Sequence, residues 1–376
     1  MLGRILGASN GERTDWVRGS AHEWRPYRPI GALRDVELCI DGRGRDDLSR
    51  QGLRANLVLD IELVDERSLA AVLAAGEDAE VAMRSFEGDL ARRWAPVHRQ
   101  SVSRRGSDGL SGKADYVTRI DFDGDWDPTD NWESLPEHPA HAACYYSVVT
   151  TRTHWYLIYA FYHPRDWSSS LLSPVRHLDS HENDLEGALV VVRRSAVEPS
   201  GVLEGMITVF HRDFYSFTPE GSPLQSGRED VDGRVRFDST TGARRPVTWQ
   251  EAEGHGLKAW SGRASNGSIR YVPGDRGAEP GGTDDTAVPY ELVDIFGPDG
   301  LWSRRDDRGL FERWGRFRGD QGGGSAHAPW RWDDHDDGPH LTGGELAVDP
   351  ARVVSIYFTG LGDFACDYER NPYLSR

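Results

Sequence analysis

The chain has 376 residues, which is long enough for one elaborated core or for two separate cores. Hydrophobic residues make up 38% of the chain and charged residues 28%, and the 42 glycines predict long loops. The formal net charge of −17 argues against a nucleic-acid partner, because binding to a phosphate backbone depends on clustered lysine and arginine side chains. A cation is the more compatible partner.

The first sixteen residues contain only short stretches of apolar sequence, too short for the core of a signal peptide. No run approaches the roughly 20 apolar residues of a membrane span. We therefore expect no transmembrane segment and, by default, a cytoplasmic location, while export by a route that reads no cleavable signal stays open. Cys39, Cys144 and Cys366 are odd in number and far apart, which predicts free, mostly buried thiols rather than disulfides or a zinc site.

Residues 53–64 alternate between apolar and polar side chains, which predicts a half-buried strand. Helical spacing follows over 68–75 and again over 80–94, and Gly76 separates the two stretches. We expect residues 1–92 to form an N-terminal extension or a small α/β layer.

Residues 93–376 are expected to form a metal-binding β-sandwich domain, because aromatic strands alternate here with Gly, Asp, Asn and Pro. The apolar run 155–162 predicts a central strand. Between 262 and 324 glycine and charge increase, and only 290–296 resembles a strand, so a loop-rich insertion is expected there. The fold class is mainly β, a β-sandwich with long loops and a few peripheral helices. Further strands are predicted over 187–193, 206–217, 246–250 and 353–358.

Chemistry-bearing residues gather between Asp166 and Glu186. If a strand begins near Asp184, its period of two places Asp184 and Glu186 on one face, and His181 enters from the loop before them. Two carboxylates and one imidazole suit a hard ion such as Mg²⁺, Ca²⁺ or Mn²⁺, and the lack of thiolates argues against structural zinc. The alternative is an edge strand with solvated acids.

Two motifs in this segment resemble those of the necrosis- and ethylene-inducing-like cytolysins. Tyr162-His-Pro-Arg-Asp166 resembles the family's Tyr-x-Phe-Pro-Lys-Asp pattern, and Ser180-His-Glu-Asn-Asp-Leu-Glu186 resembles its Gly-His-Arg-His-Asp-Trp-Glu heptad. The run 145–192 is still more similar to the bacterial and fungal vacuolar-sorting-related branch of this superfamily. The resemblance implies a β-sandwich with a solvent-facing cavity. Its cation would be held, partly through waters, by Asp166, His181, Asp184 and Glu186.

Two later patches extend the resemblance. Residues 208–215, with His211, and 246–257, with His255 between two glycines, resemble strands whose histidines would face the same cavity. The alternative for each is a core histidine satisfied by backbone groups. Ser180, Asn183 and Leu185 stand where the heptad has Gly, His and Trp, so cation binding can survive these differences but membrane lysis does not follow.

Asp123, Asp125 and Asp127 lie at alternate positions, as ligands do in a calcium loop. The segment lacks the glycine at the sixth position and has Ser134 where an EF-hand has glutamate. A second ion and an Asx-rich turn are both compatible with this pattern.

Three functions remain open from the sequence. The first is a toxin-like effector that recognises a polar small molecule, a glycan or a lipid headgroup in the cation-containing cavity. The second is a metal-dependent enzyme of the hydrolase or lyase type, in which His255 or His211 moves protons, and glycines 254 and 256 let the substrate approach His255. In the third, the ion only fastens the loop between Asp166 and Asp184.

Overall fold

The structure is a computed structural model, and it divides into two compact units, Met1–Asp89 with Asp367–Arg376 and Leu90–Cys366. The strand expected over 53–64 lies outside the described residues. Besides four short strands within the first 65 residues, the structure describes residues 66–168, 180–263, 267–322, 326–335 and 340–374.

The first unit contains most of one long helix, α2 (Glu66–Trp94). The expected division into two helices at Gly76 is wrong, because one glycine costs a helix only about 1 kcal/mol and the flanking residues are alanine-rich. The Arg370 guanidinium donates to the carboxylates of Glu80 and Glu87, at 2.9 and 2.6 Å. The strands of this unit are β1 (Arg4–Ile5), β2 (Trp16–Arg18), β3 (Trp24–Pro26), β4 (Leu38–Cys39) and β21 (Tyr368–Arg370).

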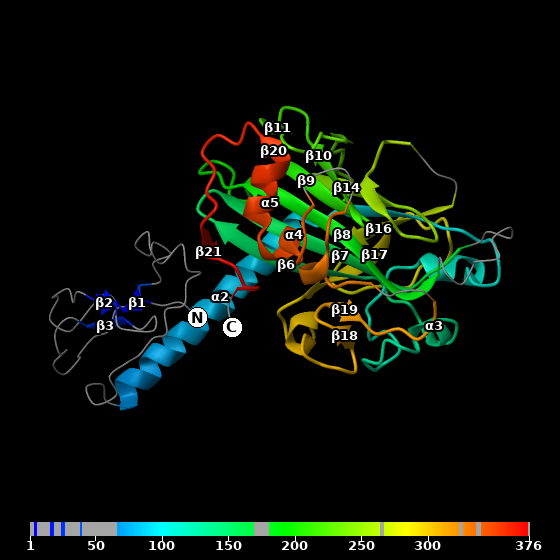
Figure 1. Cartoon of the computed structure of the whole chain (residues 1–376), viewed down its shortest axis with the longest axis horizontal. Coiled ribbons are helices and arrows are strands. Elements are labelled where there is room, and N and C mark those ends of the chain that lie inside the picture. The colour runs from blue at the N-terminus through cyan, green and yellow to red at the C-terminus, as the bar shows by residue number, and fades with distance from the viewer. Residues whose placement is uncertain are drawn as a thin grey trace. The chain divides into compact units, whose positions relative to one another are not determined.

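The second unit is built on one mixed sheet (Figure 1). Its neighbouring strands, in spatial order, are β12 (Gly233–Arg234), β10 (Asp213–Thr218), β9 (Val202–Phe210), β8 (His181–Arg193), β7 (His154–Asp166), β6 (Ala143–Thr151), β17 (Val288–Asp294), β16 (Ser268–Pro273), β5 (Val97–Ser101), β14 (Arg245–Gln250) and β13 (Phe237–Asp238). Strand β15 (Leu257–Ala259) pairs with β14 as well.

Smaller elements surround this sheet. Among the described residues no helix combines the length and apolar character that a membrane span requires. The remaining strands and helices are β11 (Gln225–Ser226), β18 (Phe311–Arg313), β19 (Arg316–Phe317), β20 (Phe358–Thr359), α3 (Asn131–Ser134), α4 (Glu345–Val348), α5 (Pro350–Tyr357), and the 3₁₀ turns η3 (Leu110–Asp115), η5 (Leu301–Arg304) and η6 (Pro329–Arg331).

The sheet curls so that its two halves face one another. His98 of β5 stacks on Phe161 of β7 with ring centroids 3.9 Å apart, although three strands separate β5 from β7 in the sheet. Tyr290 of β17 meets the same Phe161 ring edge-on at 6.1 Å. The prediction of a mainly β, sandwich-like fold with few helices is therefore confirmed.

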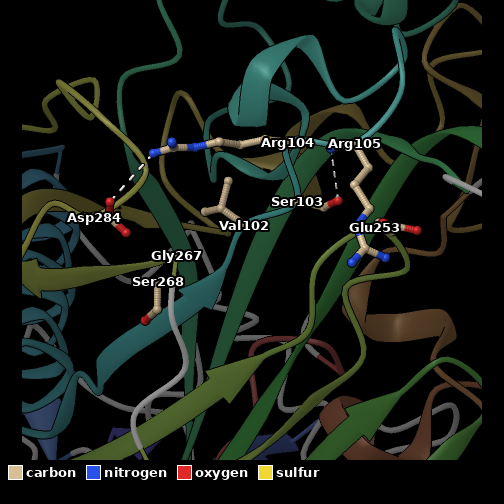
Figure 2. A pocket seen from close by; sticks show the side chains of 8 residues that line it. All are labelled: Val102, Ser103, Arg104, Arg105, Glu253, Gly267, Ser268 and Asp284. Carbon is tan, nitrogen blue, oxygen red and sulfur yellow. Dashed lines mark hydrogen bonds and ion pairs between the residues drawn. The ribbon is translucent and has the colours of Figure 1, made fainter.

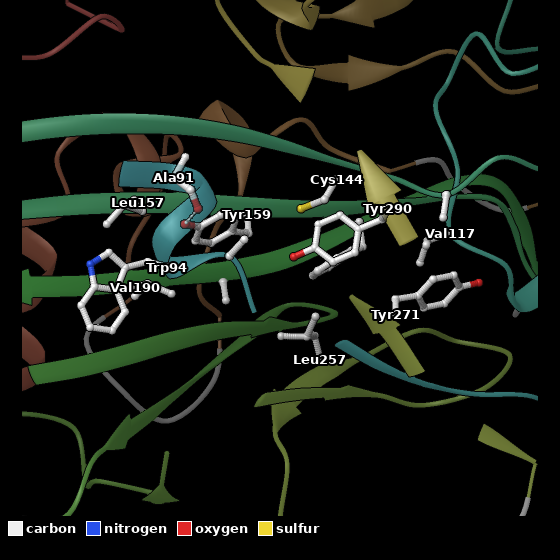
Figure 3. Close-up of a cluster of buried hydrophobic side chains, with 14 of the residues drawn as sticks. Ala91, Trp94, Val117, Cys144, Leu157, Tyr159, Val190, Leu257, Tyr271 and Tyr290 are labelled. Carbon is white, nitrogen blue, oxygen red and sulfur yellow. Dashed lines mark hydrogen bonds between the residues drawn. The ribbon is translucent and has the colours of Figure 1, made fainter. Parts of the chain in front are cut away.

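The core between the two halves combines aliphatic side chains with large aromatic rings (Figure 3). The buried Tyr159 hydroxyl donates to the Ala91 carbonyl at 2.7 Å, and the Tyr290 hydroxyl donates to the Pro96 carbonyl at the same distance. These bonds let large rings be buried without leaving their polar ends unpaired. Cys144 is buried, as expected for a free thiol, whereas Cys366 is exposed, contrary to that expectation.

Three predicted strands differ from the structure. Residues 353–358 belong mainly to helix α5, because Pro350 starts a helix and Val353, Val354 and Tyr357 share its buried face; their branched and aromatic side chains had suggested a strand. The run 206–217 is a hairpin of β9 and β10, turned at His211. The interval 262–324 contains β16, β18 and β19 besides β17, so the expectation of a single strand there is wrong.

Leu189 lies fully buried in the middle of β8, whereas Val197 is 84% exposed. Leu189→Asp should lower the free energy of unfolding by about 3–5 kcal/mol, because the core offers no partner for the new charge. Val197→Asp is the matched control and should change it by less than about 0.5 kcal/mol. Urea denaturation measures both, and equal values would place Leu189 outside the core.

Candidate functional site

The candidate site lies where β7 and β8 meet at one end of the sheet. Antiparallel pairing sets Asp166 opposite His181 and His163 opposite Asp184. His181 Nε2 lies 3.5 Å from Asp166 Oδ2, so the first two predicted ligands are brought together. Strand β8 begins at His181 rather than near Asp184, and His181 is therefore a strand residue.

A regular strand would place His181 and Asp184 on opposite faces, since they are three residues apart. Between them, Asn183 has a φ of 57°, in the left-handed region that asparagine tolerates better than most residues. This conformation interrupts the alternation of β8. His181 reaches Asp166 through the direct pairing of β7 and β8, and on the other side of the irregularity the negative charge of Asp184 also acts on Asp166.

The side chain of Asn183 holds this conformation in place. Its amide Nδ2 donates to the carbonyls of Pro128 and Arg318, at 2.9 and 2.7 Å, and its Oδ1 accepts from the Tyr162 hydroxyl. Its backbone carbonyl accepts from Ala326 at 3.0 Å. Sequence analysis treated Asn183 only as a departure from the family heptad and missed this positioning role.

Glu186, the next carboxylate along β8, is buried and fully engaged. Its Oε1 accepts the His211 backbone N–H at 2.7 Å and lies 3.3 Å from His211 Nδ1, and its Oε2 accepts the Leu257 N–H at 3.1 Å. Burial raises the pKa of Glu186 to about 8, although the hydrogen bond with His211 works in the opposite direction. His211 Nε2 lies 3.0 Å from Glu251 Oε1, and the bonds to Glu186 and Glu251 raise the pKa of His211 to about 11.

Asp184 is held by His255, from the loop between β14 and β15. His255 Nδ1 lies 3.0 Å from Asp184 Oδ2, and its Nε2 lies 3.2 Å from Asp115 Oδ1. Burial would lower the pKa of His255, but the hydrogen bonds with Asp115 and Asp184 raise it to about 10. Burial would raise the pKa of Asp184, but the bond with His255 lowers it to about 2. The His255 ring is fully buried and stacks on His163 at 3.8 Å.

The glycines beside His255 admit neighbouring side chains rather than a substrate. A Cβ at Gly254 would lie 2.9 Å from the His211 ring, and one at Gly256 would lie 2.5 Å from the Phe210 ring. The expectation that they open a path to His255 is therefore wrong. Because glycine has no Cβ, Gly254 and Gly256 let the rings of His211 and Phe210 pack closely around His255.

Asp115 is a residue of the site that sequence analysis missed. It is fully buried and accepts the backbone N–H groups of Ser103 and Glu253, at 2.6 and 2.8 Å, and the Trp167 indole N–H at 3.1 Å. No motif surrounds Asp115 in the sequence, so only the folded chain shows its role.

Asp115 also connects the site to an open pocket of about 870 Å³ (Figure 2). Ser103 and Glu253, whose N–H groups bind Asp115, both line this pocket, so its wall is shared with the site. Arg104 crosses the pocket toward Asp284, with 3.5 Å between Nη2 and Oδ2. The pocket wall consists of Val102, Ser103, Arg104, Arg105, Glu253, Gly267, Ser268 and Asp284.

The three carboxylates repel one another in this buried setting. Burial, followed by the charge of Asp184, raises the pKa of Asp166 to about 7, and Asp184 also adds to the raised pKa of Glu186. Oxygen donors with one imidazole fit a hard divalent ion. Within the described ranges, however, Asp166, His181, Asp184 and Glu186 do not place three ligand atoms within 4.8 Å of one another. The reason is that Asp184 is turned toward His255 and Glu186 toward His211.

A second acidic group lies in the loop before α3. Asp123, Asp125 and Asp130 bring carboxylate oxygens within 4.8 Å of one another and could hold a metal ion. Asp127, which sequence analysis placed in this set, instead accepts the backbone N–H and the hydroxyl of Thr129 in an Asx turn. Asp130, the residue directly before α3, is the third member of the acidic group instead of Asp127. Burial and the charges of Asp123 and Asp125 raise the pKa of Asp130.

No family model and no curated protein matches the chain. Solved structures that are similar in part include "Toxin fold for microbial attack and plant defense", at 13% identity and a TM-score of 0.34, covering 64% of this chain and 83% of that one. "NLPPya in complex with mannosamine" has 15% identity, a TM-score of 0.33 and coverage of 64% and 83%. "Crystal structure of non-toxic HaNLP3 protein" has 14% identity, a TM-score of 0.30, and coverage of 64% of this chain and 84% of that one. Similarity at this level does not assign a function.

Asn183 offers a direct test of how the site is positioned. Asn183→Ala should lower the free energy of unfolding by about 3–5 kcal/mol, because it removes several buried hydrogen bonds and places a Cβ in the left-handed region without compensation. Asn183→Gly loses the same bonds but accepts the backbone conformation, so it should be about 1 kcal/mol less destabilising. Chemical denaturation separates them, and an alanine variant as stable as the glycine variant would contradict this role.

Proposed function

We propose that the chain binds one divalent cation through Asp166, His181, Asp184 and Glu186, and that it recognises a polar ligand, a glycan or a lipid headgroup, beside this cation. The observation that carries the proposal is the grouping of two buried carboxylates, Asp184 and Glu186, with the half-buried Asp166 at the end of the paired strands β7 and β8, where the charge of Asp184 acts on both of the others. Mg²⁺ or Ca²⁺ suits this ligand set, and Mn²⁺ is the third candidate.

A bound cation would relieve the repulsion that the fold builds into this site. Burying a carboxylate is costly unless a positive charge lies close to it. In the structure His211 and His255 provide that charge to Glu186 and Asp184. Asp166 lies 3.5 Å from His181, and a cation beside it would also offset the negative charge of Asp184 that acts on it.

The residues that would meet the ligand are those at the solvent-facing side of the site. The side chains of His211, Glu251 and His181 are 43%, 33% and 25% exposed, whereas His255 is fully enclosed. Carboxylate and imidazole groups can accept from and donate to the hydroxyls of a sugar. A hard ion keeps positions for ligand oxygens when the protein does not fill its coordination sphere.

The catalytic alternative receives less support from this geometry. A general base must be unprotonated, but carboxylates hold both His211 and His255 in the protonated form at neutral pH. His255, the first candidate from the sequence, has both ring nitrogens occupied by carboxylates. Its role in our proposal is to position Asp184 rather than to move a proton.

Added Ca²⁺ or Mg²⁺ should raise the melting temperature, and EDTA should reverse the effect. An ion that binds only the folded state at 100 times its Kd stabilises it by about 2.7 kcal/mol. Asp184→Asn should abolish the response yet remain folded, because the amide keeps the shape and Asp115 still holds His255. Asp363→Asn, which changes an exposed carboxylate paired with Arg152, is the control and should respond like the wild type. No cation response together with no metal in elemental analysis would rule out the site.

His211→Ala should separate recognition from cation binding. The variant should keep the cation-induced rise in melting temperature but bind the polar ligand at least about tenfold more weakly, because it loses an exposed donor beside Glu186. Mannosamine, glucosamine and phosphocholine are the first ligands to titrate by calorimetry, with and without EDTA. Mass spectrometry of the same mixtures tests turnover: a cation-dependent product would favour the enzyme, and cation binding with no ligand would favour a purely structural ion.

A further inference from the structure

A basic hairpin carries an exposed tryptophan in this acidic chain. Residues 302–318 contain six arginines and three acidic residues, a net charge of +3, although the whole chain carries −17. Within this stretch β18 and β19 pair as a two-stranded sheet of their own, whose Phe317 ring lies against Tyr162 of β7. Figure 1 labels both strands below β7 in this view, outside the main sheet.

Trp314 and Gly315 form the turn of this hairpin, with Gly315 at a φ of 67°. The Trp314 side chain is 45% exposed, and its ring is fixed from behind by Trp302 and Trp330, with centroids 5.5 and 6.2 Å away. Trp302 and Trp330 in turn meet edge-on at 5.0 Å. Trp314 is therefore a rigid aromatic platform rather than a loose side chain.

Positive charge surrounds this platform. Arg313 and Arg316 lie directly opposite one another across the hairpin, an arrangement that destabilises an isolated pair of strands. The Glu312 carboxylate lies 3.5 Å from Arg316 Nε and offsets its positive charge. Arg313 is exposed and forms no ion pair among the described residues. The Arg305 guanidinium lies 4.9 Å from the Trp302 ring centroid.

Part of the surroundings of the hairpin is also positively charged. His327, which bridges to Arg316, has its pKa lowered to about 4 by burial and by the positive charges of Arg331 and Arg316. The acidic loop that contains Asp123, Asp125 and Asp130 approaches both ends of the segment: the Arg304 guanidinium lies 4.1 Å from the Trp126 ring centroid, and Asn183 donates to the carbonyls of both Pro128 and Arg318. The turn itself therefore presents an indole and guanidinium groups together.

This combination fits a sugar polymer that carries carboxylates. An indole face provides a large, flat contact for the apolar face of a sugar ring, and a guanidinium binds a carboxylate with two parallel hydrogen bonds. A membrane fits less well, because Trp314 is the one exposed large hydrophobic side chain of residues 302–318 and its ring packs against Trp302 and Trp330.

From this geometry we infer that the β18–β19 turn is a second binding site, which takes an acidic polysaccharide through Trp314, Arg313 and Arg316. The site needs no cation and does not depend on the proposed function, since Trp314, Arg313 and Arg316 are not among the proposed cation ligands.

The test measures binding of the full chain to polygalacturonate by affinity electrophoresis in EDTA, with dextran as the neutral polymer. The wild type should be retarded by polygalacturonate only. Trp314→Ala and Arg313→Gln should each weaken binding about tenfold or more. Arg152→Gln, which removes another exposed arginine, is the matched control and should bind like the wild type.

Arg313→Gln is informative even if Trp314→Ala perturbs the aromatic cluster, because the Arg313 side chain is exposed. Absence of binding in the wild type, or equal binding by Arg313→Gln and Arg152→Gln, would overturn the inference. Binding only to phosphatidylcholine vesicles that contain about one fifth phosphatidylserine would overturn it in favour of a membrane surface. Because EDTA is present throughout, failure here is distinguishable from failure of the cation site.

Discussion

The left-handed conformation of Asn183 is the constraint on which the candidate site depends. Strand β8 carries His181 and Asp184 at a spacing that would normally separate them onto opposite faces. The amide of Asn183 binds the carbonyls of Pro128 and Arg318, which belong to segments far apart in the sequence. The loop before α3 and the end of the β18–β19 hairpin thus hold the irregularity in β8, and β8 in turn presents the carboxylates.

Electrostatics explains why the site contains so many charged groups. Three carboxylates cannot share a buried space without compensation, and the fold supplies it through His211 and His255. Each histidine bridges two carboxylates: His211 lies between Glu186 and Glu251, and His255 lies between Asp184 and Asp115. At the end of β7, Asp166 lies beside His181 and under the negative charge of Asp184, and a cation there would complete the balance.

Sequence patterns predicted the parts of this structure that depend on local order. The apolar run 155–162 gave the central strand β7, and the acidic spacing after residue 180 located Asp184 and Glu186. Asp115 and Glu251 could not be predicted, because they reach the site from η3 and from the β14–β15 loop only after the sheet curls. Helix α5 was predicted as a strand because Val353 and Val354 favour strands in isolation. Pro350 at its start and the burial of one helical face stabilise the helix instead.

The central claim is that Asp166, His181, Asp184 and Glu186 hold a divalent cation. Crystals grown with Mn²⁺ and measured at its absorption edge test it most directly, because the anomalous signal locates the metal without assumptions about stability or ligand. We expect a peak about 2.1–2.4 Å from oxygens of the three carboxylates, with His181 bound directly or through a water. A peak only at Asp123, Asp125 and Asp130, or no peak near Asp166, would contradict it.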